Sequence, residues 1–310
     1  MSFHPQSSSD SPLVPTVRTH GTLLATRPLY WSIRRELWEN RSIAIAPAAV
    51  AAVVLFASLI NMLRLPARMT TLSALDPARQ HAALVRPFGM APAPIMMATF
   101  IVAFIYCLDA LYGERRDRSI LFWKSLPVSD RTTVLSKASV PFLILPLIAF
   151  ALGVATLAIM LLLSTAILLV NGLSPARLWA ELRLFQEPVT MLYGLTIHVL
   201  WFAPIYGWLL LVSAWARRMP VLWAGLPFFT IGIVEWLGFR TNHLATFLKY
   251  RFTGAMTLGF SRPQRGAFTF DLSQLELLRF LSTPGLWLGL LAAAACLAAA
   301  VRLRRDRGPI

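Results

Sequence analysis

The sequence predicts an all-α integral membrane protein with six transmembrane helices, preceded by an N-terminal amphipathic helix. Of its 310 residues, 57% are hydrophobic and 14% are charged, whereas soluble domains are about half apolar and about a quarter charged. Several uncharged runs also reach the roughly 20 residues that cross a bilayer as a helix. The net charge of +15 fits basic flanks that set topology and meet anionic headgroups, so we expect contact with membrane lipid and not with nucleic acid.

The six expected spans lie in one transmembrane domain, residues 43–303. They are 43–63, 92–112, 140–170, 188–215, 220–239 and 284–303. The third is long, because no charged residue occurs between Lys137 and Arg177. A hairpin inside it would need a polar turn, and none is present between 141 and 163. We therefore expect one tilted helix with a kink near Pro141 and Pro146.

Basic residues predict the orientation of the spans. Residues 1–27 are rich in Ser, Pro and Thr and lack an apolar signal-peptide region, so we expect a disordered cytoplasmic tail, with a second tail at 304–310. Six spans place both tails on one side, and that side has more of the Lys and Arg of the short loops. Both termini are therefore expected in the cytoplasm. The arginines of the first outer loop oppose this assignment: Arg64, Arg68, Arg79 and Arg86.

Residues 28–41 have the pattern of an amphipathic helix. Proline at position 28 suits a first helical turn. One face gathers the apolar side chains Tyr30, Trp31, Ile33, Leu37 and Trp38, and the other gathers Arg34, Arg35, Glu36 and Glu39. A helix with tryptophan on one side and arginine on the other is expected to lie along the membrane surface.

The loop after the second span, residues 113–137, is unusually rich in both charge and apolar residues. Ile120, Leu121, Phe122 and Trp123 stand together, flanked by Glu114, Arg115, Arg116 and Lys124. This composition is typical of a surface that another protein covers. Asp117 favours a short helix at 118–124, Pro127 ends it, and Ser129 or Asp130 caps the next helix. The alternative is that Phe122 and Trp123 dip into the membrane interface.

The same loop resembles the cytoplasmic coupling segment of ABC-2 type transporter permeases. The matching positions are Glu114 and Arg115, then Ser119 with the apolar run 120–122, then Ser125, Pro127 and Lys137. Arg118 departs from the family, which often has Gly there. The resemblance implies the transmembrane subunit of a bacterial ABC exporter, which acts as a dimer, here expected to be a homodimer, bound to two ATPase subunits. It also implies that 28–41 is the elbow helix, and that the outer loop 240–283 holds short capping helices, for which 271–279 has helical spacing.

No catalytic motif is present in the sequence. It has no phosphate-cradling G-x-x-x-x-G-K-[ST] loop, no H-E-x-x-H and no G-x-S-x-G, so we expect the chain not to be an enzyme and to bind no cofactor or metal. ATP and Mg²⁺ are then expected in the partner subunit. Cys107 and Cys296 lie in apolar runs and are expected to be small packing residues.

Three ionisable residues lie within or near the spans: Asp109, His198 and Glu235. Asp109 follows the pattern of an ion pair with Arg115 or Arg116, and Glu235 that of a pair with Arg240. His198 lies deeper and shares three- and four-residue steps with Trp201 and Trp208. This stripe is a candidate substrate path for a hydrophobic or amphipathic molecule, and packing or lipid contact is the alternative.

Two other functions fit the same sequence. An ion-coupled secondary transporter would use Asp109, His198 and Glu235, and it predicts an internal repeat that we do not find. A non-transporting membrane scaffold or sensor would use the 113–137 loop to bind a regulatory protein. An ATPase encoded beside this chain would favour the exporter over both.

Overall fold

The computed structural model describes residues 28–67, 76–125, 128–182, 185–260 and 276–307, and all of its elements are helices. Six helical segments are long and apolar enough to cross a membrane: Ser42–Leu63, Arg79–Arg116, Asp130–Val170, Gln186–Trp215, Pro220–Phe239 and Pro284–Asp306. Each contains or overlaps one expected span, which confirms the helical fold and agrees with a multi-pass membrane protein. The expected tail 1–27 lies outside the described residues.

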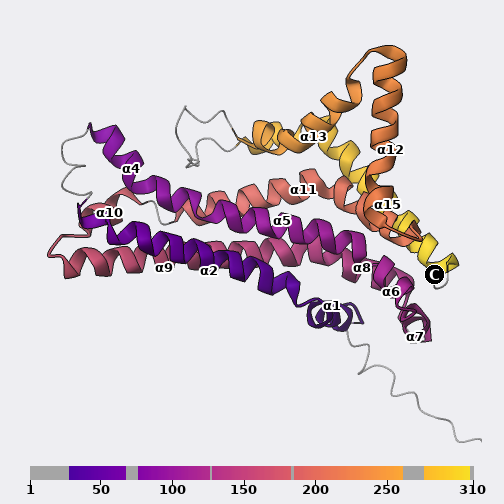
Figure 1. The fold of residues 1–310 in the computed structure, drawn as a ribbon, viewed down its shortest axis with the longest axis horizontal. Helices are drawn as coiled ribbons and strands as arrows, with labels where there is room; N and C mark the ends of the chain where they lie inside the picture. The colour runs from indigo at the N-terminus through magenta and orange to yellow at the C-terminus, as the bar shows by residue number, and fades with distance from the viewer. Residues whose placement is uncertain (1–27, 68–75, 126–127, 183–184, 261–275, 308–310) are drawn as a thin grey trace, which may run out of the picture.

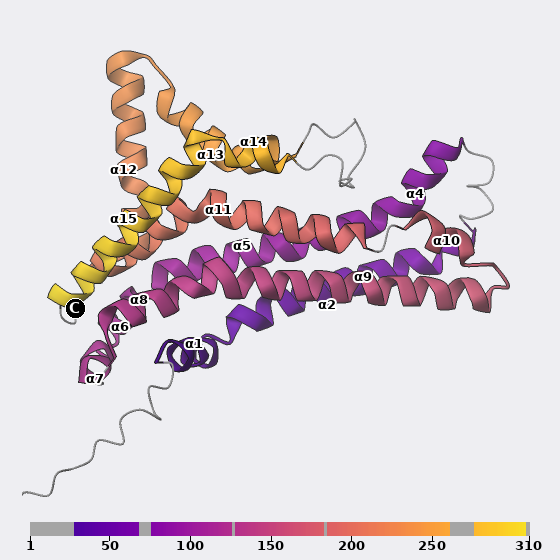
Figure 2. The ribbon, with the colours of Figure 1, turned by 180° about the vertical axis from the view of Figure 1, so that it is seen from behind.

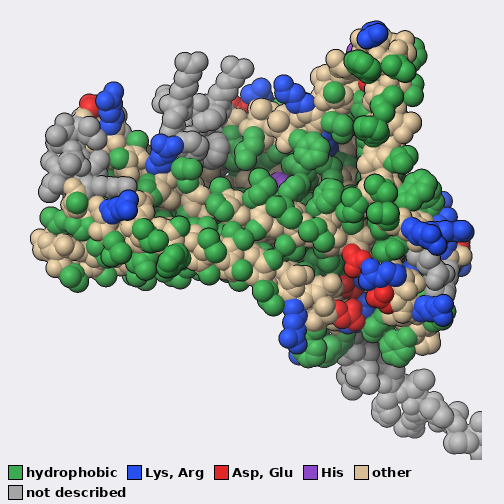
Figure 3. Space-filling view, in the orientation of Figure 1, with side chains coloured by type: hydrophobic (Ala, Val, Ile, Leu, Met, Phe, Trp, Pro, Cys, Tyr) green, Lys and Arg blue, Asp and Glu red, His purple; other side chains and the backbone are tan. Residues whose placement is uncertain are grey.

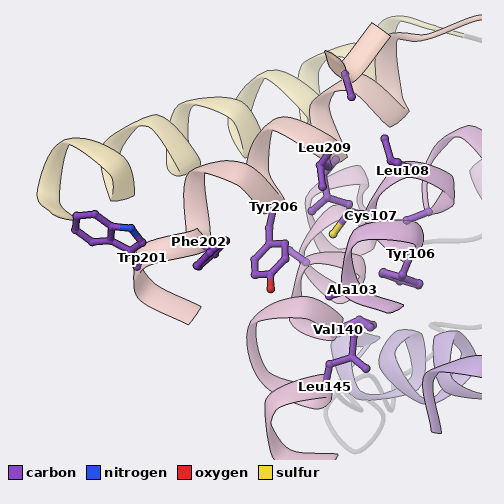
Figure 4. Packing of buried hydrophobic residues seen from close by; sticks show 14 of the residues in the cluster. Ala103, Tyr106, Cys107, Leu108, Val140, Leu145, Trp201, Phe202, Tyr206 and Leu209 are labelled. Atoms are coloured by element: carbon purple, nitrogen blue, oxygen red, sulfur yellow. The ribbon is translucent and has the colours of Figure 1, made fainter. Parts of the chain in front are cut away.

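Four long helices form a bundle and run side by side in both views (Figures 1 and 2). They are α2 (Ser42–Leu63), α5 (Pro92–Asp109), α9 (Leu145–Val170) and α11 (Gln186–Trp215). The last span, α15 (Pro284–Asp306), packs along α11. The main core lies where these helices meet, around Tyr106, Cys107, Phe202 and Tyr206 (Figure 4).

The third span is one continuous helical segment of 41 residues, as the sequence predicts. It consists of α8 (Asp130–Ser139), the π-helical turn η1 (Val140–Ile144) and α9. The wide turn contains Pro141 as its second residue and ends two residues before Pro146. Proline has no amide hydrogen for the helical ladder, so a local π turn accommodates the two residues without breaking the helix.

The first described helix, α1 (Pro28–Glu39), packs against α8. Its apolar residues Trp31 and Trp38 are exposed, whereas Glu36 is fully buried. The expected division into two faces is wrong for Arg34, which lies over the Trp31 and Trp38 rings, 5.4 and 4.9 Å from their centroids, and so shares their face. Glu36, on the other side, is turned into the protein and not toward water. The placement of α1 along a membrane surface stays a prediction.

The fifth span stands away from the bundle. It comprises α12 (Pro220–Val234) and the π-helical η2 (Glu235–Phe239), and most of its side chains are exposed. After it, α13 (His243–Gly259) packs across α11, followed by the short α14 (Leu277–Leu281). The expected capping helix 271–279 lies mostly outside the described residues, and its end from Leu277 is helical.

Two short pairs complete the fold at opposite ends of the bundle (Figure 1). At one end α4 (Pro77–Met90) contacts α10 (Ala176–Glu181). At the other end lie α6 (Tyr112–Arg116) and α7 (Ile120–Ser125), together with α1 and the end of α15. Residues Arg304 to Asp306 of the expected C-terminal tail belong to α15, and the cytoplasmic position of this tail stays a prediction.

Candidate functional site

The loop between the second and third spans forms a helical projection at one end of the molecule. The chain leaves α6, turns at Asp117 and Arg118, and forms α7, which extends beyond the bundle (Figures 1 and 2). The short helix expected at 118–124 is thus present at Ile120–Ser125. Ser129 caps α8 by accepting a hydrogen bond from the Thr132 amide at 3.1 Å, as predicted. Pro127 lies outside the described residues.

The four apolar residues of α7 have different surroundings. Leu121 and Phe122 are 58% and 59% exposed, whereas Ile120 is completely buried. The Trp123 ring is half-buried between the Phe122 ring, at a centroid distance of 4.9 Å, and the Arg35 guanidinium, 3.8 Å from its centroid. The expected apolar surface is therefore smaller than the sequence suggests. Ile120 anchors α7, and Leu121 with Phe122 forms its outward face.

Beneath α7 lies a buried cluster of acidic and basic side chains, which we call the charge cluster. Its members are Arg35, Glu36, Glu114, Asp130, Lys137 and Arg304. They come from α1, α6, α8 and α15, four elements that are distant in sequence. Figure 3 shows the red and blue side chains gathered at this end, in contrast to the green bundle.

Glu114 lies at the centre of the charge cluster. One carboxylate oxygen is 3.1 Å from both Lys137 Nζ and Arg35 Nη2, and the other accepts a hydrogen bond from Arg304. Glu36 accepts hydrogen bonds from Lys137 at 2.9 Å and from the Tyr106 hydroxyl at 2.8 Å. The six members are three acids and three bases, so their charges can be buried together. A fourth acid, the exposed Glu39, also pairs with Arg35 at 3.5 Å.

Arg115 ties the loop to the end of α11. Its Nη1 donates to the carbonyls of Ala214 and Ala216 at 2.7 and 3.1 Å, and the side chain is buried. It is therefore engaged within the chain and does not contribute to the exposed surface of the loop. Arg116 is more than half exposed and lies 3.7 Å from Asp109, which confirms the expected ion pair.

Other residues of the loop hold α7 in place. Lys124 Nζ donates to the carbonyls of Arg305 and Arg307 at 3.3 and 3.1 Å, so it contacts the end of the last helix. Ser119 Oγ donates to the Glu114 carbonyl at 3.4 Å. Of the residues expected to face an ATPase, the described ones that remain exposed are Arg116, Leu121, Phe122 and Lys124.

A large cavity of about 870 Å³ lies farther along the bundle. It is lined by residues of α4, α5, η1, α9, α11 and α13, most of them apolar. His198 is one of them. Its Nε2 lies 3.1 Å from the Tyr206 hydroxyl, and its ring stacks on Phe202 at a centroid distance of 4.3 Å. The position of His198 agrees with the expected candidate path.

The two tryptophans of the expected stripe do not line this cavity. Trp201 is fully buried and donates to the Arg251 carbonyl of α13 at 2.7 Å, and Trp208 donates to the Ala224 carbonyl of α12 at 3.1 Å. At about 100° per residue, they lie about 60° and 80° round α11 from His198. Figure 4 shows Trp201 and Tyr206 pointing to different sides of the helix. The expected stripe therefore spans two faces.

Glu235 has a different role from the expected ion pair. It accepts hydrogen bonds from the Thr241 hydroxyl at 3.0 Å, from the Leu244 amide at 2.9 Å and from the His243 amide. The last two amides begin α13, so the carboxylate caps that helix from the end of the fifth span. Arg240 instead lies over the Trp236 ring, 5.3 Å from its centroid.

Sequence reasoning missed Glu187, which lies in the first turn of α11 and lines the cavity. Its only sequence signal is an acid at the start of an apolar run, which helix capping explains equally well. No group of three or more His, Cys, Asp and Glu side chains with the geometry for a metal ion occurs in the part of the chain that the structure describes.

Comparison with known proteins gives no relative from which a function could be inferred. No family model, no curated protein and no solved structure matches the chain. The function is therefore argued from α7, the charge cluster and the cavity.

Proposed function

We propose that the chain is the membrane-spanning permease subunit of an ATP-driven ABC exporter and that α7 couples it to a separate ATPase subunit. The observation that supports this best is the exposed pair Leu121 and Phe122 on a short helix beyond the end of the bundle. A small apolar surface rimmed by charge is typical of a protein interface. A loop that only reconnects two spans has no need of one.

The charge cluster supports a mechanical role for this helix. Glu114 and Lys137 join the end of the second span to the start of the third, and Arg304 joins both to the last span. Arg115 adds the end of α11. A displacement of α7 would thus move several spans together as rigid bodies, because separating them would expose unpaired buried charges.

The remaining parts of the exporter belong to the proposal as well. ATP and Mg²⁺ are held by the ATPase subunit, and the permease acts as a homodimer in the bacterial inner membrane, with both termini in the cytoplasm. The exposed apolar side chains of α12, such as Phe229 and Ile231, must be covered by lipid or by the second copy. The common position of α1, α7 and the end of α15 (Figure 1) agrees with a single cytoplasmic end.

No observation favours the ion-coupled carrier. Its three ionisable residues have separate surroundings, since Asp109 pairs with Arg116 at the α7 end, Glu235 caps α13 and His198 lines the cavity. Proton coupling through all three would need a chain of polar groups between them. The scaffold or sensor hypothesis uses the same α7 surface, so it is separated from the exporter by experiment.

The test uses proteoliposomes that contain the chain and its ATPase. We expect Phe122→Ala to leave the fold intact, because the side chain is exposed, and to uncouple ATP hydrolysis from transport. Trp38→Ala is the matched control, an exposed aromatic residue on α1 at the same end. Transport by Phe122→Ala at the wild-type rate would refute a coupling role for α7.

A further inference from the structure

The cavity has the size and access of a small-molecule site. Its volume of about 870 Å³ falls within the range of about 300–1,000 Å³ that is typical of ligand pockets. Residues from spans two, three and four line it, and α13 closes one side through Phe252, Ala255 and Met256. A pocket built between helices in this way has rigid walls and a wall segment, α13, that belongs to no span.

The walls favour an apolar or aromatic body. They combine methionines, such as Met96, Met191 and Met256, with the aromatic rings of Phe100 and Phe252. The thioether side chain is unbranched and polarizable, so a methionine-rich wall adapts to ligands of different shape. Aromatic rings add edge and face contacts.

The charge of the cavity is opposite to that of the chain. Glu187 is the one residue with a formal charge at pH 7 among the described lining residues if histidine is neutral, and no Lys or Arg lines the cavity. Within the described ranges, no hydrogen bond or ion pair joins another residue to the Glu187 side chain. A half-buried carboxylate without a cation is costly. A ligand that brings a cation would remove this cost.

Two polar groups of the cavity, Glu187 and His198, lie at different heights along the axis of α11. His198 follows Glu187 by eleven residues, which is about 16 Å along a helix. At the deeper level the His198 ring stacks on Phe202, and the Phe100 ring meets His198 edge-on at a centroid distance of 5.4 Å. The cavity thus has a carboxylate at one level and an aromatic wall at the other.

We propose that this cavity binds an amphipathic organic cation, with an amine or quaternary ammonium head at Glu187 and an apolar or aromatic body that reaches toward His198. This proposal rests on the proposed function only in naming that molecule as the transported substrate. Binding itself does not depend on an ATPase. The same chemistry occurs in small cationic amphiphiles and in amine-headed lipids, and the experiment separates these two sources.

The first measurement is binding of dansylcadaverine to the purified full-length chain in a non-ionic detergent, followed by the rise in dansyl fluorescence. Its N-acetylated derivative has the same fluorophore and nearly the same length but no charge. We expect saturable binding of the amine and at least tenfold weaker binding of the acetylated compound. Equal affinity for the two, or saturable binding of neither, would overturn the proposal.

Variants then assign the selectivity to Glu187. Glu187→Gln should bind the amine at least tenfold more weakly, with unchanged binding of the acetylated compound, and Glu187→Asp should stay within a few-fold of wild type. Glu181→Gln, an acid that pairs with His81 outside the cavity, should behave as wild type. If Glu187 only complements the N-terminus of α11, Glu187→Gln lowers the melting temperature without changing amine binding, and the proposal fails.

Competition identifies the source of the cation. Displacement of the dye by phosphatidylethanolamine, but not by phosphatidylglycerol, supports a lipid amine, and displacement by neither supports a small molecule. Because no ATPase is present in these assays, their failure is distinct from failure of the exporter proposal. If the chain binds the cation but has no ATPase partner, the cation site is supported and the exporter proposal fails.

Discussion

At Arg118 the backbone adopts a left-handed conformation, with φ of 58°. Such a conformation costs a residue with a Cβ about 1–2 kcal/mol, and glycine avoids this cost but loses about 0.5–1 kcal/mol of chain entropy on folding. We therefore predict that Arg118→Gly raises the stability of the chain by up to about 1 kcal/mol, measured by thermal melting in detergent. Arg118→Ala keeps the strain and should show no gain. An equal gain in both variants would contradict this explanation.

Arg118 is also the position at which the loop departs from the ABC-2 permease pattern. ABC-2 permeases often have glycine where this chain has Arg118, and the observed turn has the geometry that glycine favours. The backbone before α7 thus makes a left-handed turn at Arg118, and the resemblance to these permeases stays a prediction. No hydrogen bond of the Arg118 side chain compensates for the strain in the described structure.

Glu114 is the residue on which the charge cluster depends most. Removing one partner of a buried ion pair costs about 3–5 kcal/mol because a charge is left uncompensated. We predict that Glu114→Gln lowers stability by roughly this amount, measured by thermal melting. Asp109→Asn is the control, since its exposed pair with Arg116 should contribute less than about 1 kcal/mol.

A double-mutant cycle tests the contact directly. Glu114→Gln with Arg304→Met should be less destabilising than the sum of the two single changes, with a coupling of about 0.5–3 kcal/mol. Additive effects would mean that the two side chains do not interact as the structure places them.

Sequence reasoning at this scale succeeded where partners are close along the chain. The Ser129 cap and the Asp109 pair with Arg116 follow from spacings of three and seven residues. It failed for Glu36 and Arg304, whose partners lie about 100 or more positions away. The polar sequence around each of these two residues predicts that its side chain is exposed. The local sequence does not show which distant helix packs over the side chain.

At the scale of elements, α13 depends on close approach to α11. A Cβ on Gly254 would overlap the Trp201 ring, and one on Gly259 would overlap Ile197. We predict that Gly254→Ala lowers stability by about 1–3 kcal/mol through overpacking and alters dansylcadaverine binding, because α13 forms one cavity wall. Gly225→Ala on α12 has open space around it and should cause no loss. A neutral Gly254→Ala would show that α13 packs more loosely than observed.

Arg251 shows why α13 was hard to interpret from sequence. The side chain is buried, lies 4.6 Å from the Trp201 ring centroid and donates to the Gly285 carbonyl at 3.1 Å. Burial lowers the pKa of this guanidinium, which nevertheless remains charged near neutral pH. A charged residue in a hydrophilic loop predicts exposure, whereas here it fastens α13 to α11 and α15.

At the scale of the whole molecule, hydropathy was enough to predict the six spans and the single long third helix. Each of these depends on composition within one segment, which the sequence states directly. The cavity was not predictable, because its walls come from spans two, three and four and from α13. The displaced position of α12 (Figure 1) depends on contacts between segments and was also missed.

The most direct test of the exporter proposal is affinity purification of the full-length chain, expressed with its neighbouring genes, from a mild detergent. We predict that a stoichiometric ATPase co-purifies with wild type and with Trp38→Ala, and is lost with Phe122→Asp, whose site is exposed and outside the charge cluster. A chain that purifies alone and moves solute into ATP-free vesicles under a proton gradient would contradict the proposal.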